Sequence, residues 1–129
     1  MKIEDLYNDD FTHYLRDLGY IATDQTRTGK ALCTVGEVDI MIRKENGTPV
    51  SIIEAFRLSS CGTDNTVISS HLNKLLHDYD SAGLKRNFVI IYAEAANYNT
   101  LWNNYILYIT DLNSKKEFTG KNKLKSFTR

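Results

Sequence analysis

The fold of this chain is decided by residues 36–56, which read GEVDIMIRKENGTPVSIIEAF. From Leu32 to Arg43 apolar and polar side chains alternate, and from Val50 to Leu58 the chain is again suited to a strand. Asn46 and Gly47 lie between the two runs and form a strong signal for a tight hairpin turn. The segment therefore predicts a β-hairpin.

Two carboxylates, Asp39 and Glu54, lie within the apolar runs of this hairpin. An unpaired ionised carboxylate in such surroundings costs several kcal/mol, so each acid needs a cation, a hydrogen-bond network or a strand end open to water. Hairpin-linked strands can bring the two acids side by side, where Mg2+ (or Mn2+) would balance their charge. Alternatively, both acids are structural and pair with Arg43, Arg57 or Lys74.

Further helices and strands are expected on both sides of the hairpin. Residues 4–18 and about 98–108 have helical apolar spacing, and Gly19 supplies a stop for the first helix. Asp64 or Thr66 can cap a helix whose apolar stripe begins at Val67, and residues 88–93 predict a strand buried on both faces. With short extended pieces between the first helix and the hairpin, the order is α-β-β-β-α-β-α, a mixed α/β sheet flanked by helices. The crossover helix implies one parallel, right-handed strand pairing.

Composition and charge indicate one ordinary globular domain. The 129 residues are 42% hydrophobic and 25% charged, and 16 basic residues balance 16 acidic ones. We expect the domain to occupy residues 1–112 and a basic tail to follow over residues 113–129. That tail has five lysines and one arginine against Glu117. It could contact a polyanion, although such a segment is more commonly a solvated, frayed terminus.

The cysteines and the apolar runs bear on the compartment. Cys33 and Cys61 are isolated, without CxxC spacing, and the acidic start MKIEDLYNDDF differs from a signal or transit peptide. No apolar run approaches the roughly 18 residues that cross a bilayer. We therefore expect a soluble cytoplasmic protein with two reduced, buried cysteines and no membrane association.

The segments GEVDIMI and PVSIIEAF resemble the PD-(D/E)XK nuclease superfamily, which has the restriction-endonuclease-like fold. Together with DQTRTG, IIEAFRL, HLNKLL and YDSAGL, they look like a bacterial branch of such domains, often appended to larger signalling or defence proteins. The resemblance covers about residues 4–108. It implies a three-layer core and a Mg2+-dependent endonuclease that hydrolyses phosphodiesters in DNA, with Asp39 and Glu54 as metal ligands. In many members of this family an acid of the leading helix joins the site, and the acids available for that role here are Glu4, Asp5, Asp9 and Asp10.

The sequence departs from the family pattern at Phe56, which occupies the position of the family's lysine. That lysine orients or helps to deprotonate the attacking water and offsets charge on the phosphate, and a phenyl ring does neither. Lys74 is the first candidate for a relocated cation. His71 lies three residues earlier on the same helix and is a further candidate. Arg57 is the second choice, since strand alternation directs it to the opposite sheet face.

Two other outcomes stay open. The domain has lost catalysis and kept its surface for binding, as part of a longer polypeptide or as a homodimer, or it is an unrelated α/β fold with structural salt bridges. For an active domain, the candidate contacts to nucleic acid are Gln25, Arg27, Lys30 and Arg57. An aromatic stacking platform is another possibility, although helical spacing is more typical of core residues. These aromatic residues are Tyr92, Tyr98, Trp102, Tyr105 and Tyr108.

Overall fold

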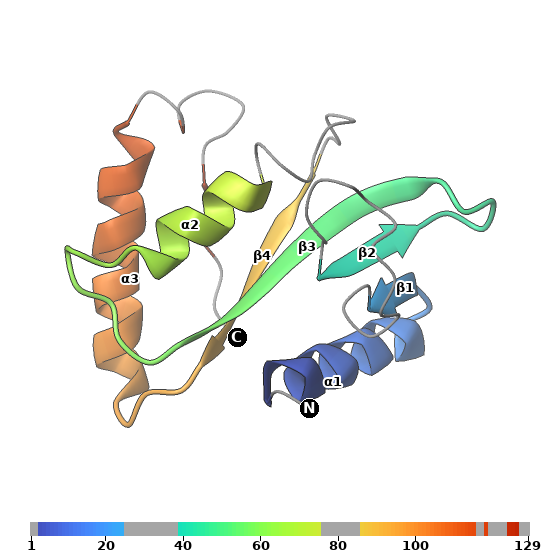
Figure 1. Ribbon diagram of the computed structural model, residues 1–129, viewed down its shortest axis with the longest axis horizontal. Coiled ribbons are helices and arrows are strands. Elements are labelled where there is room, and N and C mark those ends of the chain that lie inside the picture. Colours follow the sequence, from blue (N-terminus) through green and yellow to red (C-terminus); the bar gives the residue numbers. More distant parts are fainter. Residues whose placement is uncertain (1–2, 25–38, 76–85, 116–117, 119–123, 127–129) are drawn as a thin grey trace. The chain divides into compact units, whose positions relative to one another are not determined.

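The computed structural model of this protein describes residues 3–24, 39–75, 86–115, 118 and 124–126, which form an α/β fold (Figure 1). The order α-β-β-β-α-β-α is as predicted. None of the described helices is both long and apolar enough to cross a lipid bilayer. The helices and strands are α1 (Ile3–Asp17), β1 (Ile21–Asp24), β2 (Ile40–Arg43), β3 (Pro49–Leu58), α2 (Val67–Asn73), β4 (Phe88–Ala93) and α3 (Tyr98–Asn113).

The four strands form one mixed sheet in the order β1-β2-β3-β4. β1 with β2 and β2 with β3 are antiparallel, whereas β3 and β4 run in the same direction (Figure 1). The predicted hairpin is confirmed: the backbone N–H of Lys44 donates to the carbonyl oxygen of Thr48 at 2.9 Å. Gly47 has a φ of +87°, in the left-handed region that glycine adopts without steric cost.

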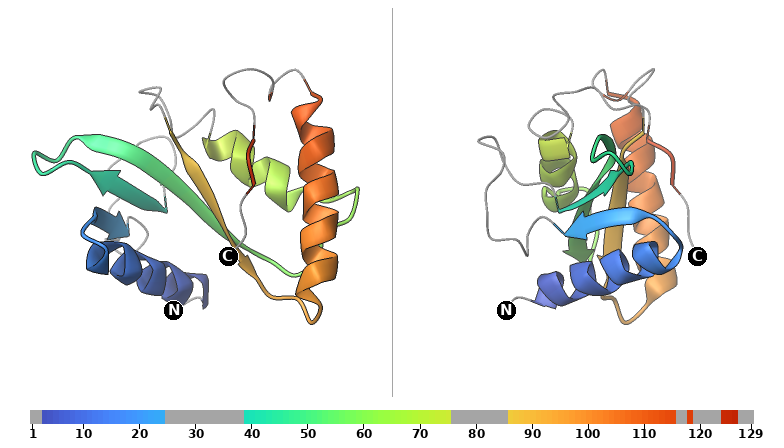
Figure 2. Two further views of the ribbon diagram at one scale, coloured as in Figure 1. Left: turned by 180° about the vertical axis from the view of Figure 1, so that it is seen from behind. Right: turned by 90° about the vertical axis from the view of Figure 1, so that its right-hand side faces the viewer.

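The alternation of side chains gives the sheet two apolar faces. α1 packs on one face and Leu75, two residues after the end of α2, packs on the other; Figure 2 shows α1 and α2 on either side of the sheet. On the α1 side, the buried residues are Leu15, Ala22, Ile40 and Ile53. On the α2 side, Ile52 and Leu75 are buried, with Met41 and Val89 packed against them. The alternation of side chains between the two faces of the hairpin is therefore as predicted. β3 has a helix on each of its faces.

The ends of α1 and α2 follow local sequence signals. α1 ends before Gly19, which has a φ of +96° and donates its N–H to the carbonyl of Arg16. Thr66 is the N-cap residue of α2 but makes no side-chain capping hydrogen bond. Val67 was predicted on the buried stripe and is 43% exposed. That prediction is wrong because α2 packs through Ile68 and Leu72, four residues apart, and Val67 lies to one side of this line.

The strand β4 is less buried than its apolar sequence predicts. Phe88 is 46% exposed, and the residues from Val89 to Tyr92 are half-buried. The prediction of a strand buried on both faces is therefore wrong. β4 is the last strand in the order of the described sheet, so its side chains lack the second neighbouring strand that a central strand has.

The chain divides into two compact units. The first contains residues 1–57 and 66–92, and the second contains residues 58–65 and 93–129. In the second unit, the Tyr108 hydroxyl donates to the carbonyl of Asn65 at 2.9 Å, and α3 buries Leu101, Ile109 and Leu112. Leu107, in contrast, is 69% exposed. Six residues beyond Leu101, it points to a different side of the helix, which turns about 100° per residue.

The described parts of residues 113–129 are held within the second unit. Phe118 is 2% exposed. The Asn113 side chain donates to the carbonyl of Leu124 at 3.0 Å and accepts the Leu124 N–H at 2.8 Å. For these residues the expectation of a frayed terminus is wrong, since one amide side chain satisfies both backbone groups of Leu124. The domain boundary at residue 112 remains a prediction.

Candidate functional site

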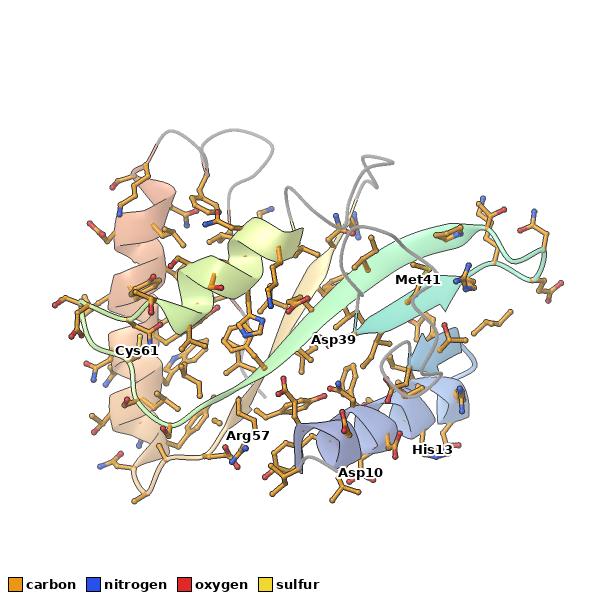
Figure 3. The ribbon with its side chains drawn as sticks, viewed as in Figure 1. Asp10, His13, Asp39, Met41, Arg57 and Cys61 are labelled. Carbon is orange, nitrogen blue, oxygen red and sulfur yellow. The ribbon has the colours of Figure 1, made fainter. Side chains whose placement is uncertain are left out.

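The β-hairpin brings Asp39 and Glu54 together. Ile40 pairs with Ile53 in the antiparallel register, so one further step places Asp39 opposite Glu54. Asp39 lies at the start of β2, beside β3 (Figure 3). Its Oδ2 atom accepts a hydrogen bond of 2.8 Å from the backbone N–H of Ala55. The two acids are therefore neighbours, as the alternating pattern of the hairpin predicts.

The electrostatics of Asp39 reflect this arrangement. Burial raises its pKa most, the negative charge of Glu54 raises it further, and the hydrogen bond from Ala55 acts in the opposite direction. Glu4 adds a smaller effect that also raises it, and the resulting pKa is about 7 instead of 3.8. The raised pKa favours a proton on Asp39 beside Glu54, and a cation can take the place of that proton.

Glu54 is held from the α2 side by a histidine. Glu54 is 2% exposed, and its Oε1 lies 2.5 Å from Nδ1 of His71. When Glu54 is ionised, Nδ1 is the donor in this bond. The imidazole of His71 stacks on the ring of Phe56, with centroids 4.4 Å apart and planes inclined by 14°. Glu54 Oε2 is buried and has no hydrogen-bond partner within the described part of the chain.

The leading helix adds a third acid and a hydrogen-bonded pair to this region. Among the four acids considered on α1, Glu4 is the one whose charge raises the pKa of Asp39. Asp10 is exposed and lies on the outer side of α1 (Figure 3). The Tyr92 hydroxyl donates to Oδ1 of the buried Asn8 at 2.7 Å. Burial, and then the charge of Asp39, raise the pKa of Tyr92, which places its hydroxyl within the field of the acids.

Sequence reasoning missed three features of the site. It did not pair His71 with Glu54, and it did not identify the stack with Phe56 or the contact between Asn8 and Tyr92. Strand alternation does place Glu54 and Phe56 on the same face of β3, which indicates that both could contact the same neighbouring residue. The contact of His71 with Glu54 depends on the rotation of α2 about its axis over the sheet. That rotation cannot be predicted from a single sequence.

The remaining predicted site residues lie in different places. Lys74 is exposed, and its ammonium contacts neither Asp39 nor Glu54 among the described residues. Arg57 is exposed, and by strand alternation it belongs to the face opposite Glu54. Their roles stay predictions. The other residues predicted to contact nucleic acid, Gln25, Arg27 and Lys30, lie outside the described residues, as does Cys33.

The aromatic residues of α3 belong to the second unit. Trp102 and Tyr105 stack at 5.8 Å, and both are half-buried. Burial raises the pKa of the Tyr105 hydroxyl. Tyr98 is 45% exposed. These contacts suit the packing of a helix, and a base-stacking role stays a prediction.

The carboxylates of Asp39 and Glu54 are the candidate donors for a metal ion at this site. Within residues 3–24, 39–75, 86–115, 118 and 124–126, no three His, Cys, Asp or Glu side chains are grouped so that they could hold a metal by themselves. Two neighbouring carboxylates nevertheless fit Mg2+, which keeps waters and takes oxygens from a substrate phosphate. The unpartnered Oε2 of Glu54 is the oxygen that such an ion would satisfy.

Comparison with known proteins identifies no relative of this chain. No family model, no curated protein and no solved structure matches the chain. The restriction-endonuclease-like architecture therefore remains an expectation from residues 4–108.

Proposed function

We propose that this protein is a nuclease-like domain that hydrolyses phosphodiesters in DNA with Mg2+ or Mn2+ held by Asp39 and Glu54. The observation that carries the proposal is the placement of the two acids opposite each other with Oε2 of Glu54 buried and unpartnered. A buried oxygen without a partner is costly, and a divalent cation satisfies it together with the neighbouring carboxylate. The element order and the resemblance support a restriction-endonuclease-like core around this pair.

The chain's own groups prepare the site for a phosphate. The Ala55 N–H fixes one oxygen of Asp39, and His71 fixes one oxygen of Glu54. A bound Mg2+ supplies Lewis-acid polarisation of a phosphoryl oxygen and lowers the pKa of a water. Glu4 contributes additional negative charge from the start of α1 and is the leading-helix acid best situated to assist. Lys74 and His71 are the candidates for the group that takes the place of the family's lysine.

A second candidate function is a catalytically inactive domain that binds a partner, within a larger signalling or defence protein or as a homodimer. The observation that favours it is Phe56, which is 1% exposed and occupies the lysine position with an apolar ring. Lys74, the first choice for a relocated cation, is exposed. In this case the acids would bind a cation, or share a proton, without cleavage.

Metal-dependent cleavage distinguishes these functions. The chain is incubated with supercoiled, linear and single-stranded DNA in Mg2+, in Mn2+ and in excess chelator. We expect Asp39→Asn and Glu54→Gln to abolish cleavage, because each removes a charge and keeps the side-chain volume. Glu45→Gln changes an exposed acid in the hairpin turn and serves as the matched control. Equal cleavage by all three variants and the parent would refute the proposal.

Calorimetry with Mn2+, read together with the cleavage assay, distinguishes an active nuclease from a catalytically inactive domain. Saturable binding that requires Glu54, combined with cleavage, supports the nuclease. Binding that requires Glu54, without cleavage of any tested DNA, supports the inactive domain. Absence of binding by a folded parent chain overturns the metal site in both forms.

A further inference from the structure

In the candidate site three side chains contact one another in sequence, Phe56 with His71 and His71 with Glu54. A lysine at position 56, as in the resembled family, would not make the first of these contacts. Phe56 stacks on His71, and His71 contacts Glu54 (4.4 Å between ring centroids and 2.5 Å between Nδ1 and Oε1). Glu54 and Phe56 are two residues apart on β3 and therefore share a face, and α2 brings His71 to that face. The chain of contacts thus links two elements around one carboxylate.

We propose that Phe56 and His71 are positioning residues for Glu54: the Phe56 ring holds the imidazole, and the imidazole holds Oε1, so that Oε2 is presented to a divalent cation. This inference rests on the proposed metal site. It gives the aromatic residue at the lysine position a function of its own. It also identifies a histidine that acts on the metal site without being a ligand.

Burial makes this arrangement rigid. Phe56 and Glu54 are 1% and 2% exposed, so neither side chain can swing into water. The His71 side chain is 22% exposed, and its ring is fixed on one side by the stack and at Nδ1 by the carboxylate. A flat aromatic neighbour restricts the rotation of the imidazole and keeps Nδ1 in the direction of Oε1. Glu54 therefore keeps one orientation before a cation arrives.

The identity of residue 56 also matters for charge. A lysine on this face would place an ammonium near Glu54, where it could form an ion pair with Oε2. Phenylalanine is neutral and leaves Oε2 without a competing cation. Hydrogen bonds to groups that ligate a metal typically change its affinity 10- to 100-fold. We therefore expect the stack and the imidazole bond to affect the affinity for the cation, and to do so together.

The test measures Mn2+ affinity of the full chain by electron paramagnetic resonance of the free ion. His71→Leu removes the donor and should weaken Mn2+ binding about 10- to 100-fold. His71→Asn keeps a donor at the δ position and should restore part of that loss. Phe56→Leu should weaken binding about tenfold in the parent but have little further effect in the His71→Leu background. Phe11→Leu, on the opposite face of the sheet, is the control for general loss of packing.

The outcomes separate this inference from the proposed function. If the parent binds Mn2+ and His71→Leu binds it as tightly, the positioning role is overturned and the metal site stands. Equal losses from Phe56→Leu in both backgrounds would show that the ring acts on packing and not through His71, which also overturns the role of Phe56. If the folded parent binds no Mn2+, both proposals fall. If Phe56→Leu does not fold, comparing Mn2+ binding by His71→Leu and His71→Asn still tests the role of the imidazole. The role of the ring is then tested with Phe56→Tyr, which keeps the ring and should bind Mn2+ as tightly as the parent.

Discussion

Asp39 and Ala55 are joined across β2 and β3 by a hydrogen bond of 2.8 Å from the Ala55 backbone N–H to Asp39 Oδ2. At the start of β2, the Asp39 carboxylate thus accepts a hydrogen bond from β3 that a backbone carbonyl would accept in a regular ladder. This bond favours the ionised form of Asp39, but burial and the charges of Glu54 and Glu4 outweigh it and raise the pKa. Asp39 is thus both a structural acceptor and an acid with a raised pKa.

The first prediction concerns the dependence of stability on pH without metal. Asp39 titrates at about 7 in the folded chain and near 3.8 in the unfolded chain, so between these values the folded state binds more protons. The free energy of unfolding should therefore fall by a few kcal/mol as the pH rises from about 4 to about 7. Urea denaturation across this range measures it. Asp39→Asn should flatten this part of the curve, and a parallel curve for that variant would contradict the assignment.

The second prediction links the same titration to metal. A cation requires ionised Asp39, so Mn2+ affinity should rise with pH and level off above about 7. Saturating Mn2+ should then remove the loss of stability expected in the metal-free chain, because binding to the folded state adds to its stability. Thermal unfolding with Mn2+ and with chelator at several pH values tests this. An identical pH profile in both conditions would argue against a metal at Asp39.

The third prediction concerns the pair Tyr92 and Asn8 in the first unit. Tyr92→Phe leaves the buried Oδ1 of Asn8 without the donor that now lies at 2.7 Å. We expect a loss of about 1–3 kcal/mol in the free energy of unfolding. Tyr20→Phe removes an exposed hydroxyl and is the control. Equal stability of both variants would show that Asn8 finds another donor.

The fourth prediction concerns the turn that fixes the hairpin register. Gly47 has a φ of +87° and no atom within 4 Å of an added Cβ, so Gly47→Ala introduces backbone strain without a clash. The cost should be roughly 1–2 kcal/mol. Gly47→Asn should cost less, because asparagine tolerates the left-handed region. Chemical denaturation of both variants measures the difference, and equal costs would indicate that the turn changes its conformation.

The fifth prediction concerns the second unit. Asn113→Ala removes both hydrogen bonds to Leu124 and should accelerate amide exchange at the Leu124 N–H severalfold or more. Asn103→Ala changes an exposed asparagine on the same helix and should leave that exchange unchanged. Unaltered exchange in Asn113→Ala would mean that other contacts hold Leu124.

The hairpin and the opposition of Asp39 and Glu54 were predictable from the sequence, because a period of two and an Asn-Gly turn together determine strand parity and approximate register. The burial of β4 was not predictable in this way, since an apolar run does not reveal whether its strand is central or at an edge. His71 shows a further limit. Its contact with Glu54 depends on the rotation of α2 over the sheet, which is set by the packing of Ile68 and Leu72 and not by local spacing.

The two hydrogen bonds between Asn113 and Leu124, and the burial of Phe118, bear on how the protein is shortened or tagged. A chain cut after residue 112 would lose Asn113, Phe118 and Leu124 and would expose apolar surface of the second unit. Such a truncation invites aggregation and low yield even though it keeps every acid of the candidate site. Shortened versions of the chain should therefore retain Asn113, Phe118 and Leu124, and an affinity tag should leave these residues in place.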